Sequence, residues 1–268
     1  MTRSLWILLC AATLWAQSSQ ERGKRVVMDA LAALGGDRYL AMQDRVETGR
    51  AYSFYREEVS GTSQTTIYTQ YLPPGGKTPG ALRVRERESF GNIQGGKFKE
   101  ISAVLFTETQ GYEITFRGAR PLADDVLDRY KSTTFHNVFY ILRERLKEPG
   151  MLFDGKGLDV WMNQPVQIVD FVDSTNDVVT VYFHDSTKLP IRQVYYRRDP
   201  KTKERIEEVT DYGRYRDVGE GVNWPFTVTR TRDGEKTFEM FSDTVQINQK
   251  LSNSLFVLPT GIKILKKL

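Results

Sequence analysis

Few side chains in this 268-residue chain have the types and spacing that catalysis requires. His184-Asp185-Ser186 holds the three residue types of a hydrolase triad. Neighbours on an extended strand point to opposite faces, so these three cannot align as a proton relay, and we expect a structural role for His184. The other histidine, His136, has no metal-ligand spacing with it and is interpreted as a partly exposed helix residue. The sequence therefore predicts a non-enzymatic protein without metal or cofactor, with an esterase as the least favoured alternative.

Two glycine-rich segments and one row of arginines are candidate anion sites. Gly75–Lys77 and Gly95–Lys97 lack the spacing of a phosphate-binding loop and are interpreted as turns. Arg83, Arg85 and Arg87 alternate along one predicted strand, which directs their guanidinium groups to the same side. Such a row is either a solvated face or a strip that recognises lipid headgroups or an acidic partner.

The charge balance argues against nucleic acid as a partner. The formal net charge is +4, from 38 basic and 34 acidic residues. So small an excess does not produce the strong basic field that nucleic-acid binding requires. The length fits one large β-rich domain or two small ones, with ample material for a core.

The first residues have the pattern of an export signal. Arg3 is followed by the apolar run Leu5–Trp15, and Ala16 precedes a polar segment. This predicts a secretory signal peptide over residues 1–16, a periplasmic location and one mature domain over residues 17–268 without a transmembrane segment.

The single cysteine lies inside the predicted signal peptide. A lipoprotein signal has a small residue directly before its cysteine, whereas Leu9 precedes Cys10. Lipid anchoring at Cys10 is therefore a disfavoured alternative. After cleavage the mature chain contains no cysteine, so its stability must come from its core without disulfides.

The segment from Asp177 to Asn248 organises the predicted fold. Val179, Val181 and Phe183 alternate with residues of the opposite face, a period of two that indicates a strand. Turn-forming clusters recur at short intervals, which predicts a multi-strand antiparallel meander. These clusters are Asp185–Lys188, Asp199–Thr202, Gly219–Gly221 and Asp233-Gly234.

Helices and further strands precede this meander. Helical spacing predicts one helix over Glu21–Leu34, a short helix over Asp37–Met42 and a central helical insert over Leu122–Leu146, with a break at Ser132–Thr134. Strands are predicted at Val46–Arg56, Ser63–Leu72, Ala81–Phe90, Lys97–Glu108, Tyr112–Phe116, Leu158–Met162 and Val166–Val172.

Short turn-and-strand motifs recur over most of the mature chain. They are Leu31–Gly36 with Val46–Arg50, Ser186–Arg192 with Tyr195, Asp211-Tyr212, Gly221–Pro225 and Leu255–Pro259. In these motifs the chain resembles the LolA-like family of periplasmic lipoprotein carriers, outer-membrane lipoprotein-sorting proteins and RseB-type relatives. The resemblance implies a mainly β (α+β) fold: a half-open, strongly curved antiparallel sheet or incomplete barrel. An N-terminal helix and a central helical insert would cover its concave face. No cargo-specifying residue matches.

A strongly curved sheet of this size leaves space on its concave face for helices or an apolar ligand. The residues predicted to line this cavity are Phe135, Val138, Phe139 and Leu142 of the insert and Val179, Val181, Phe183, Phe238 and Met240 of the strands. An apolar stripe at helical spacing is core by default, so simple core filling is the alternative.

Two hypotheses of function follow. The first is an exported, non-enzymatic protein that holds a lipid or acyl chain, such as a carrier of lipoproteins or lipids to the outer membrane. The second is a periplasmic interaction or sensor module that binds an envelope protein and no lipid. A lipid that co-purifies would favour the first, and a filled core with a stable protein complex would favour the second.

Overall fold

The computed structural model describes residues 19–73, 81–199 and 202–267. The predicted signal peptide, Cys10 and the glycine-rich segment Gly75–Lys77 lie outside the described residues. Within the described ranges, no helix combines the length and apolar character needed to span a bilayer.

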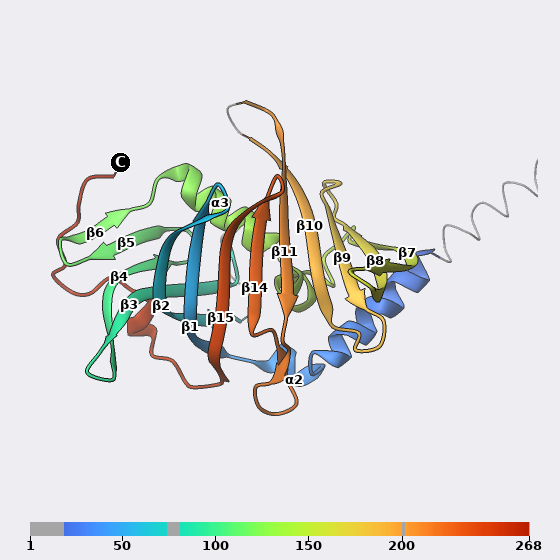
Figure 1. Cartoon of the computed structure of the whole chain (residues 1–268), viewed down its shortest axis with the longest axis horizontal. Helices are drawn as coiled ribbons and strands as arrows, with labels where there is room; N and C mark the ends of the chain where they lie inside the picture. The colour runs from blue at the N-terminus through green and yellow to red at the C-terminus, as the bar shows by residue number, and fades with distance from the viewer. Residues whose placement is uncertain (1–18, 74–80, 200–201, 268) are drawn as a thin grey trace, which may run out of the picture.

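The architecture is one large antiparallel sheet that curves without closing (Figure 1). Its thirteen strands follow the order β6-β5-β4-β3-β2-β1-β15-β14-β11-β10-β9-β8-β7, so two meanders join where β1 pairs with β15. The first meander contains β1 (Asp44–Tyr55), β2 (Glu58–Tyr71), β3 (Val84–Gln94), β4 (Lys97–Phe106), β5 (Gly111–Thr115) and β6 (Gly118–Pro121). The second contains β7 (Leu152–Trp161), β8 (Gln164–Val172), β9 (Val178–His184), β10 (Pro190–Arg198), β11 (Arg205–Gly213), β14 (Thr227–Arg232) and β15 (Glu235–Ile247).

These strands confirm the predicted fold class, with differences in detail. The prediction missed β6 and placed the start of β7 at Leu158, six residues after its actual start at Leu152. A two-stranded ribbon of β12 (Arg216–Asp217) and β13 (Asn223–Trp224) stands beside the large sheet.

The helices gather on one face of the sheet, called here the inner face. The N-terminal helix spans residues 19–33, followed by α2 (Asp37–Ala41). The central insert consists of α3 (Asp124–Phe135), α4 (Val138–Tyr140) and the π-helical turn η1 (Ile141–Arg145). Figure 1 shows α3 crossing behind the strands in that view.

The break in the insert lies at His136-Asn137, and its predicted position at Ser132–Thr134 was wrong. Asn137 has an extended backbone and begins α4, because its side-chain oxygen accepts a hydrogen bond from the Phe139 N–H at 2.9 Å. The Val138 N–H also donates to Gln193 Oε1 of β10 at 2.8 Å, which ties the start of α4 to the sheet.

The main core lies between these helices and the second meander. Val181 and Phe183 of β9, both fully buried, belong to the same hydrophobic cluster as Val138 and Leu142 of the insert. Leu34, at the end of the N-terminal helix, belongs to the same cluster. This half of the inner face is therefore filled by the protein's own side chains.

A second, smaller core lies on the outer face of the first meander. Leu105 and Ile114 point to this face, where the C-terminal segment covers them. Phe256 of the 3₁₀ turn η2 (Asn253–Phe256) is buried there, and Ile264 bridges to Ala119 at the sheet edge. The sheet is thus packed on its inner face in one half and on its outer face in the other.

Candidate ligand groove

An open groove of about 1250 Å³ lies at one end of the sheet. There the N-terminal helix, α2 and η1 approach the first residue of β1 and the last residues of β2. We call it the apolar groove. Its apolar lining residues are Val27, Met28, Leu31, Leu40, Ala41, Met42, Tyr71, Leu72, Pro73, Leu142, Leu146, Phe153 and Leu251.

The floor and the walls of the apolar groove differ in exposure. Val27, Met42 and Leu142 are fully buried and make the floor, since they belong to the main core. Leu40 and Leu72 are half-buried, and Met28 is 50% exposed. Apolar surface left open beside a packed core is the usual form of a site for an apolar ligand.

Basic side chains outnumber acidic ones around this groove. Lys24, Lys147 and Lys250 are exposed, and within the described part of the chain none of them has a carboxylate at ion-pair distance. The remaining charged lining residues are Arg83, Arg143, Asp37, Asp44 and Glu144. The rim is therefore suited to an anionic headgroup above the apolar floor.

Arg143 holds the two helical walls of the groove together. Its guanidinium donates to the Tyr39 carbonyl at 2.6 Å and to the Met42 carbonyl, and it lies 4.1 Å from the centre of the Tyr71 ring. Its Nε is 3.1 Å from Glu144, which also pairs with Arg83 at 2.6 Å. Burial raises the pKa of Glu144, although Arg83 and Arg143 act in the opposite direction.

The residues predicted to line a cavity lie mostly in the core. Val138, Leu142, Val181 and Phe183 are 0% exposed, and Val179 is 2% exposed. Phe139, at 7%, packs edge-on against Tyr212 and beside Trp224. Leu142 alone of the nine residues lines the apolar groove. Contact of any of the nine with a ligand stays a prediction.

Three of the nine residues lie apart from this cluster. Phe135 precedes the break, and its ring is covered by the Arg145 guanidinium at 3.4 Å, so it does not continue the stripe of α4 and η1. Met240 is buried on the inner face of β15, and Phe238, half-buried, contacts Arg230 at 5.2 Å.

The inner face of the first meander is polar, which the sequence analysis did not predict. Arg45 of β1 donates to the Tyr71 hydroxyl at 3.0 Å and lies 4.1 Å from the Trp224 ring centre. Glu47 accepts a hydrogen bond from the Ser242 hydroxyl. This half of the concave face is therefore unsuited to an acyl chain.

The residues considered for catalysis have structural roles. His184 Nδ1 accepts hydrogen bonds from the N–H groups of Ser186 and Thr187, both at 3.2 Å, and so closes a turn. His136 is buried rather than partly exposed, because its ring stacks on Tyr195 at 3.8 Å between α3 and β10. Burial lowers the pKa of His136.

The predicted arginine row is neutralised within the fold. Arg85 pairs with Glu108 at 2.6 Å and Arg87 with Glu100 at 2.8 Å, while Arg83 turns to Glu144 of the insert. The three guanidinium groups are therefore used in ion pairs within the fold, and only that of Arg87 with Glu100 joins two neighbouring strands.

The apolar groove was missed because its residues come from distant segments that only the fold brings together. One signal was available: the predicted helix Glu21–Leu34 carries Met28 outside its buried stripe of Val27 and Leu31.

No family model and no curated protein sequence matches this chain. Solved structures do. An outer membrane lipoprotein-sorting protein domain from Vibrio parahaemolyticus is 12% identical with a TM-score of 0.56, over 88% of this chain and 97% of that one. A DUF1329 family protein from Desulfovibrio piger is 12% identical with a TM-score of 0.58, over the same shares.

A LolA superfamily protein from Nitrosomonas europaea is 6% identical with a TM-score of 0.52, over 88% of this chain and 97% of that one. At these identities the likeness concerns the fold alone. The chain therefore has the LolA-like fold.

Proposed function

We propose that this protein is an exported, non-enzymatic lipid-binding protein of the periplasm, and that it holds an acyl chain in the apolar groove with the anionic end of the lipid at the lysine rim. The observation that carries the proposal is the groove itself, where a half-exposed apolar wall meets Lys24, Lys147 and Lys250. One structural neighbour is named for outer-membrane lipoprotein sorting, which supports a lipid-modified protein as the cargo.

The free energy expected for binding an acyl chain in this groove is compatible with reversible binding and release. Burial of one methylene stabilises a complex by about 0.8 kcal/mol, which is roughly a fourfold gain in affinity. An acyl chain laid partly in an open groove would gain several such increments and still dissociate. A carrier must release its cargo, so moderate affinity is expected.

The test is a calorimetric titration of the mature protein with lysophosphatidylglycerols of increasing acyl length. We expect affinity to rise about fourfold per added methylene until the groove is filled. The variant L72Q places an amide on the half-buried wall and should weaken binding about tenfold or more. Absence of a chain-length dependence, or full affinity in L72Q, contradicts the proposal.

The second candidate function is binding of a partner protein at the edge strand β7, outside the part that the N-terminal helix contacts at Phe153–Gly155. β7 is the last strand of the sheet, and its residues Leu158 and Val160 are 65% and 68% exposed. The filled core beneath the insert also agrees with a module that needs no cargo. An exposed apolar edge strand can accept a strand from another chain.

One matched variant separates the two functions. L158Q makes the same substitution as L72Q, on the exposed part of β7. If the groove binds lipid, L158Q retains full affinity for lysophosphatidylglycerol. If the edge binds a protein, L158Q loses a partner recovered from periplasmic extract, whereas L72Q keeps it.

A further inference from the structure

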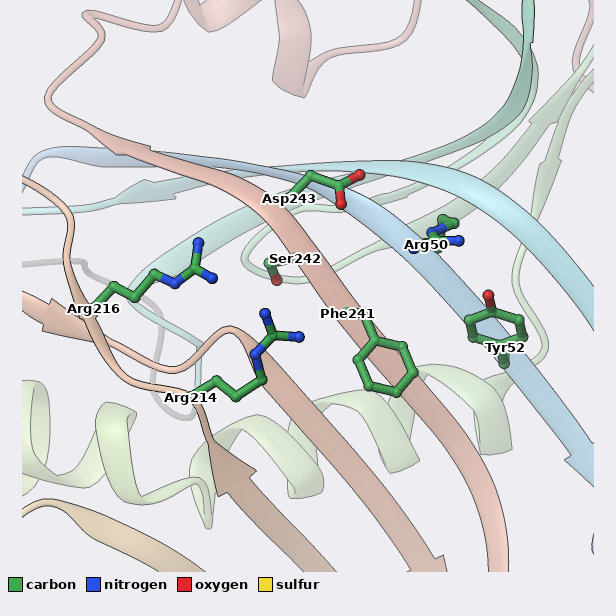
Figure 2. Close-up of a pocket in the computed structure, with 7 residues that line it drawn as sticks. All are labelled: Arg50, Tyr52, Arg214, Arg216, Phe241, Ser242 and Asp243. Atoms are coloured by element: carbon green, nitrogen blue, oxygen red, sulfur yellow. The ribbon is translucent and has the colours of Figure 1, made fainter.

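A second pocket, of about 410 Å³, opens on the outer face of the sheet where β1 and β15 pair (Figure 2). It is separate from the apolar groove, and the two have no lining residue in common. Its lining residues are Arg50, Tyr52, Arg214, Arg216, Phe241, Ser242 and Asp243. We call it the arginine pocket.

Three arginines reach this pocket from two separate parts of the chain. Arg50 stands on β1 opposite Phe241 of β15. Arg214 follows β11 with a left-handed φ of 53°, and Arg216 opens β12 with its guanidinium 4.6 Å from the Phe226 ring centre. Figure 2 shows Arg214 and Arg216 extending from this connection toward β15.

A β-bulge shapes the floor of the arginine pocket. The register between β1 and β15 shifts at Thr48/Gly49, so that Gly49 pairs with Ser242 and Thr48 with Thr244. The unpaired residue Asp243 is displaced outward at this point. Bulges often redirect side chains beside a binding site.

Among the residues that the structure describes, none is an anionic partner of the guanidinium groups of this pocket. In the described part of the chain, no carboxylate lies within 4.0 Å of Arg50, Arg214 or Arg216, although Asp243 stands in the same pocket. Several other arginines of the sheet do have a carboxylate partner, as Arg192 has Asp211 at 3.1 Å and Arg197 has Glu208 at 2.9 Å. The pocket therefore keeps an excess of positive charge.

We infer that the arginine pocket binds a phosphate-type oxyanion, either free or as the head of a phosphate ester. A guanidinium presents two parallel N–H donors that match two phosphate oxygens, and its weak hydration lowers the cost of binding. Arg214 and Arg216, two positions apart, would share one anion, with Arg50 on the opposite side. The Tyr52 and Phe241 rings, edge-to-face at 6.0 Å, would face the organic part of an ester.

Calorimetry with inorganic phosphate, with glycerol phosphate and with vesicles of phosphatidylglycerol in phosphatidylcholine tests the inference. We expect saturable binding of at least one probe, weakened about tenfold or more in the double variant R214Q/R216Q. Binding of inorganic phosphate identifies the free anion as a ligand. Binding of vesicles alone identifies the lipid headgroup.

The matched control is R25Q/R129Q, which removes the same charge from two exposed arginines outside the pocket. Equal loss in both double variants means that only net charge matters and overturns the inference, as does failure of all three probes to bind. R50Q provides an independent check on another strand and should weaken binding as well. Because these arginines are exposed, circular dichroism of each variant should match the parent.

Discussion

At the scale of single residues, the least expected feature is the pair Glu86 and Glu88 on the inner face of β3. Their strand positions lie opposite Thr69 and Ile67, on the face that also carries Arg45. Burial beneath α3, together with the neighbouring Glu86 carboxylate, raises the pKa of Glu88 to about 8. Burial also raises the pKa of Glu86, opposed by Arg45 and Arg230.

This pair makes the stability of the protein depend on pH. Above about pH 4.5 the Glu88 carboxyl is ionised in the unfolded chain, whereas in the folded protein it keeps its proton up to about pH 8. The free energy of unfolding therefore falls as the pH rises from about 4.5 to about 8, and it stays lower above that range. The variant E88Q should therefore be more stable than the parent at pH 9 by about 1–2 kcal/mol, after allowance for solvent screening. The gain should vanish near pH 4.5.

Urea unfolding at the two pH values measures the effect. E58Q, an exposed substitution on β2, is the control and should change stability by less than about 0.5 kcal/mol at either pH. A parent protein as stable at pH 9 as at pH 5, with E88Q no different, would show that Glu88 titrates normally.

At the scale of elements, the N-terminal helix sits unusually close to the edge of the sheet. A Cβ on Gly23 would come within 2.2 Å of the Phe153 carbonyl oxygen, and one on Gly155 would meet the Gly23 backbone at 2.7 Å. Ser19 adds a hydrogen bond to Asp154 at 2.8 Å. Two facing glycines therefore let helix and strand backbones touch.

We expect G23A to lower the free energy of unfolding by about 1–3 kcal/mol, because the added methyl forces the helix away from β7. The control G213A adds the same methyl where the nearest atom is 3.9 Å away and φ is not positive, so it should be neutral or slightly stabilising. Thermal unfolding of both variants gives the comparison. An unchanged free energy of unfolding in G23A would mean that the helix can move away from β7 without cost.

Most elements could be predicted because their signals are local. The alternation of Val179, Val181 and Phe183 indicates β9 directly, and Gly35-Gly36 ends the first helix as expected. β6 was missed because four residues are too few to show a period. The break at Asn137 was misplaced because its cap depends on one side chain. The inner-face polarity and the apolar groove depend on strand order, which periodicity does not encode.

At the scale of the whole molecule, two cores on opposite faces share one sheet. Phe256 is 1% exposed in the outer core and Val181 is 0% exposed in the main core. The continuous hydrogen-bonded ladder joins the two, so they should unfold together.

The variant F256A should cost about 3–5 kcal/mol, and V181A about 1–3 kcal/mol, each within one cooperative transition. The control F116A removes a ring that is 88% exposed and should cost less than about 0.5 kcal/mol. Denaturation followed by both tryptophan fluorescence and circular dichroism tests cooperativity. Separate transitions by the two probes would mean that the halves behave as independent units.

The pairing of β1 with β15 has a consequence for the order of folding. Thr48 and Thr244 bond at 2.6 Å across this junction, although 196 positions separate them in the chain. Each meander can form from neighbouring strands, whereas the junction requires closure of a very long loop, which makes it slow. Until β15 arrives, the edges of β1 and β14 stay open to wrong pairing, so the join is the step at which a chaperone would help most.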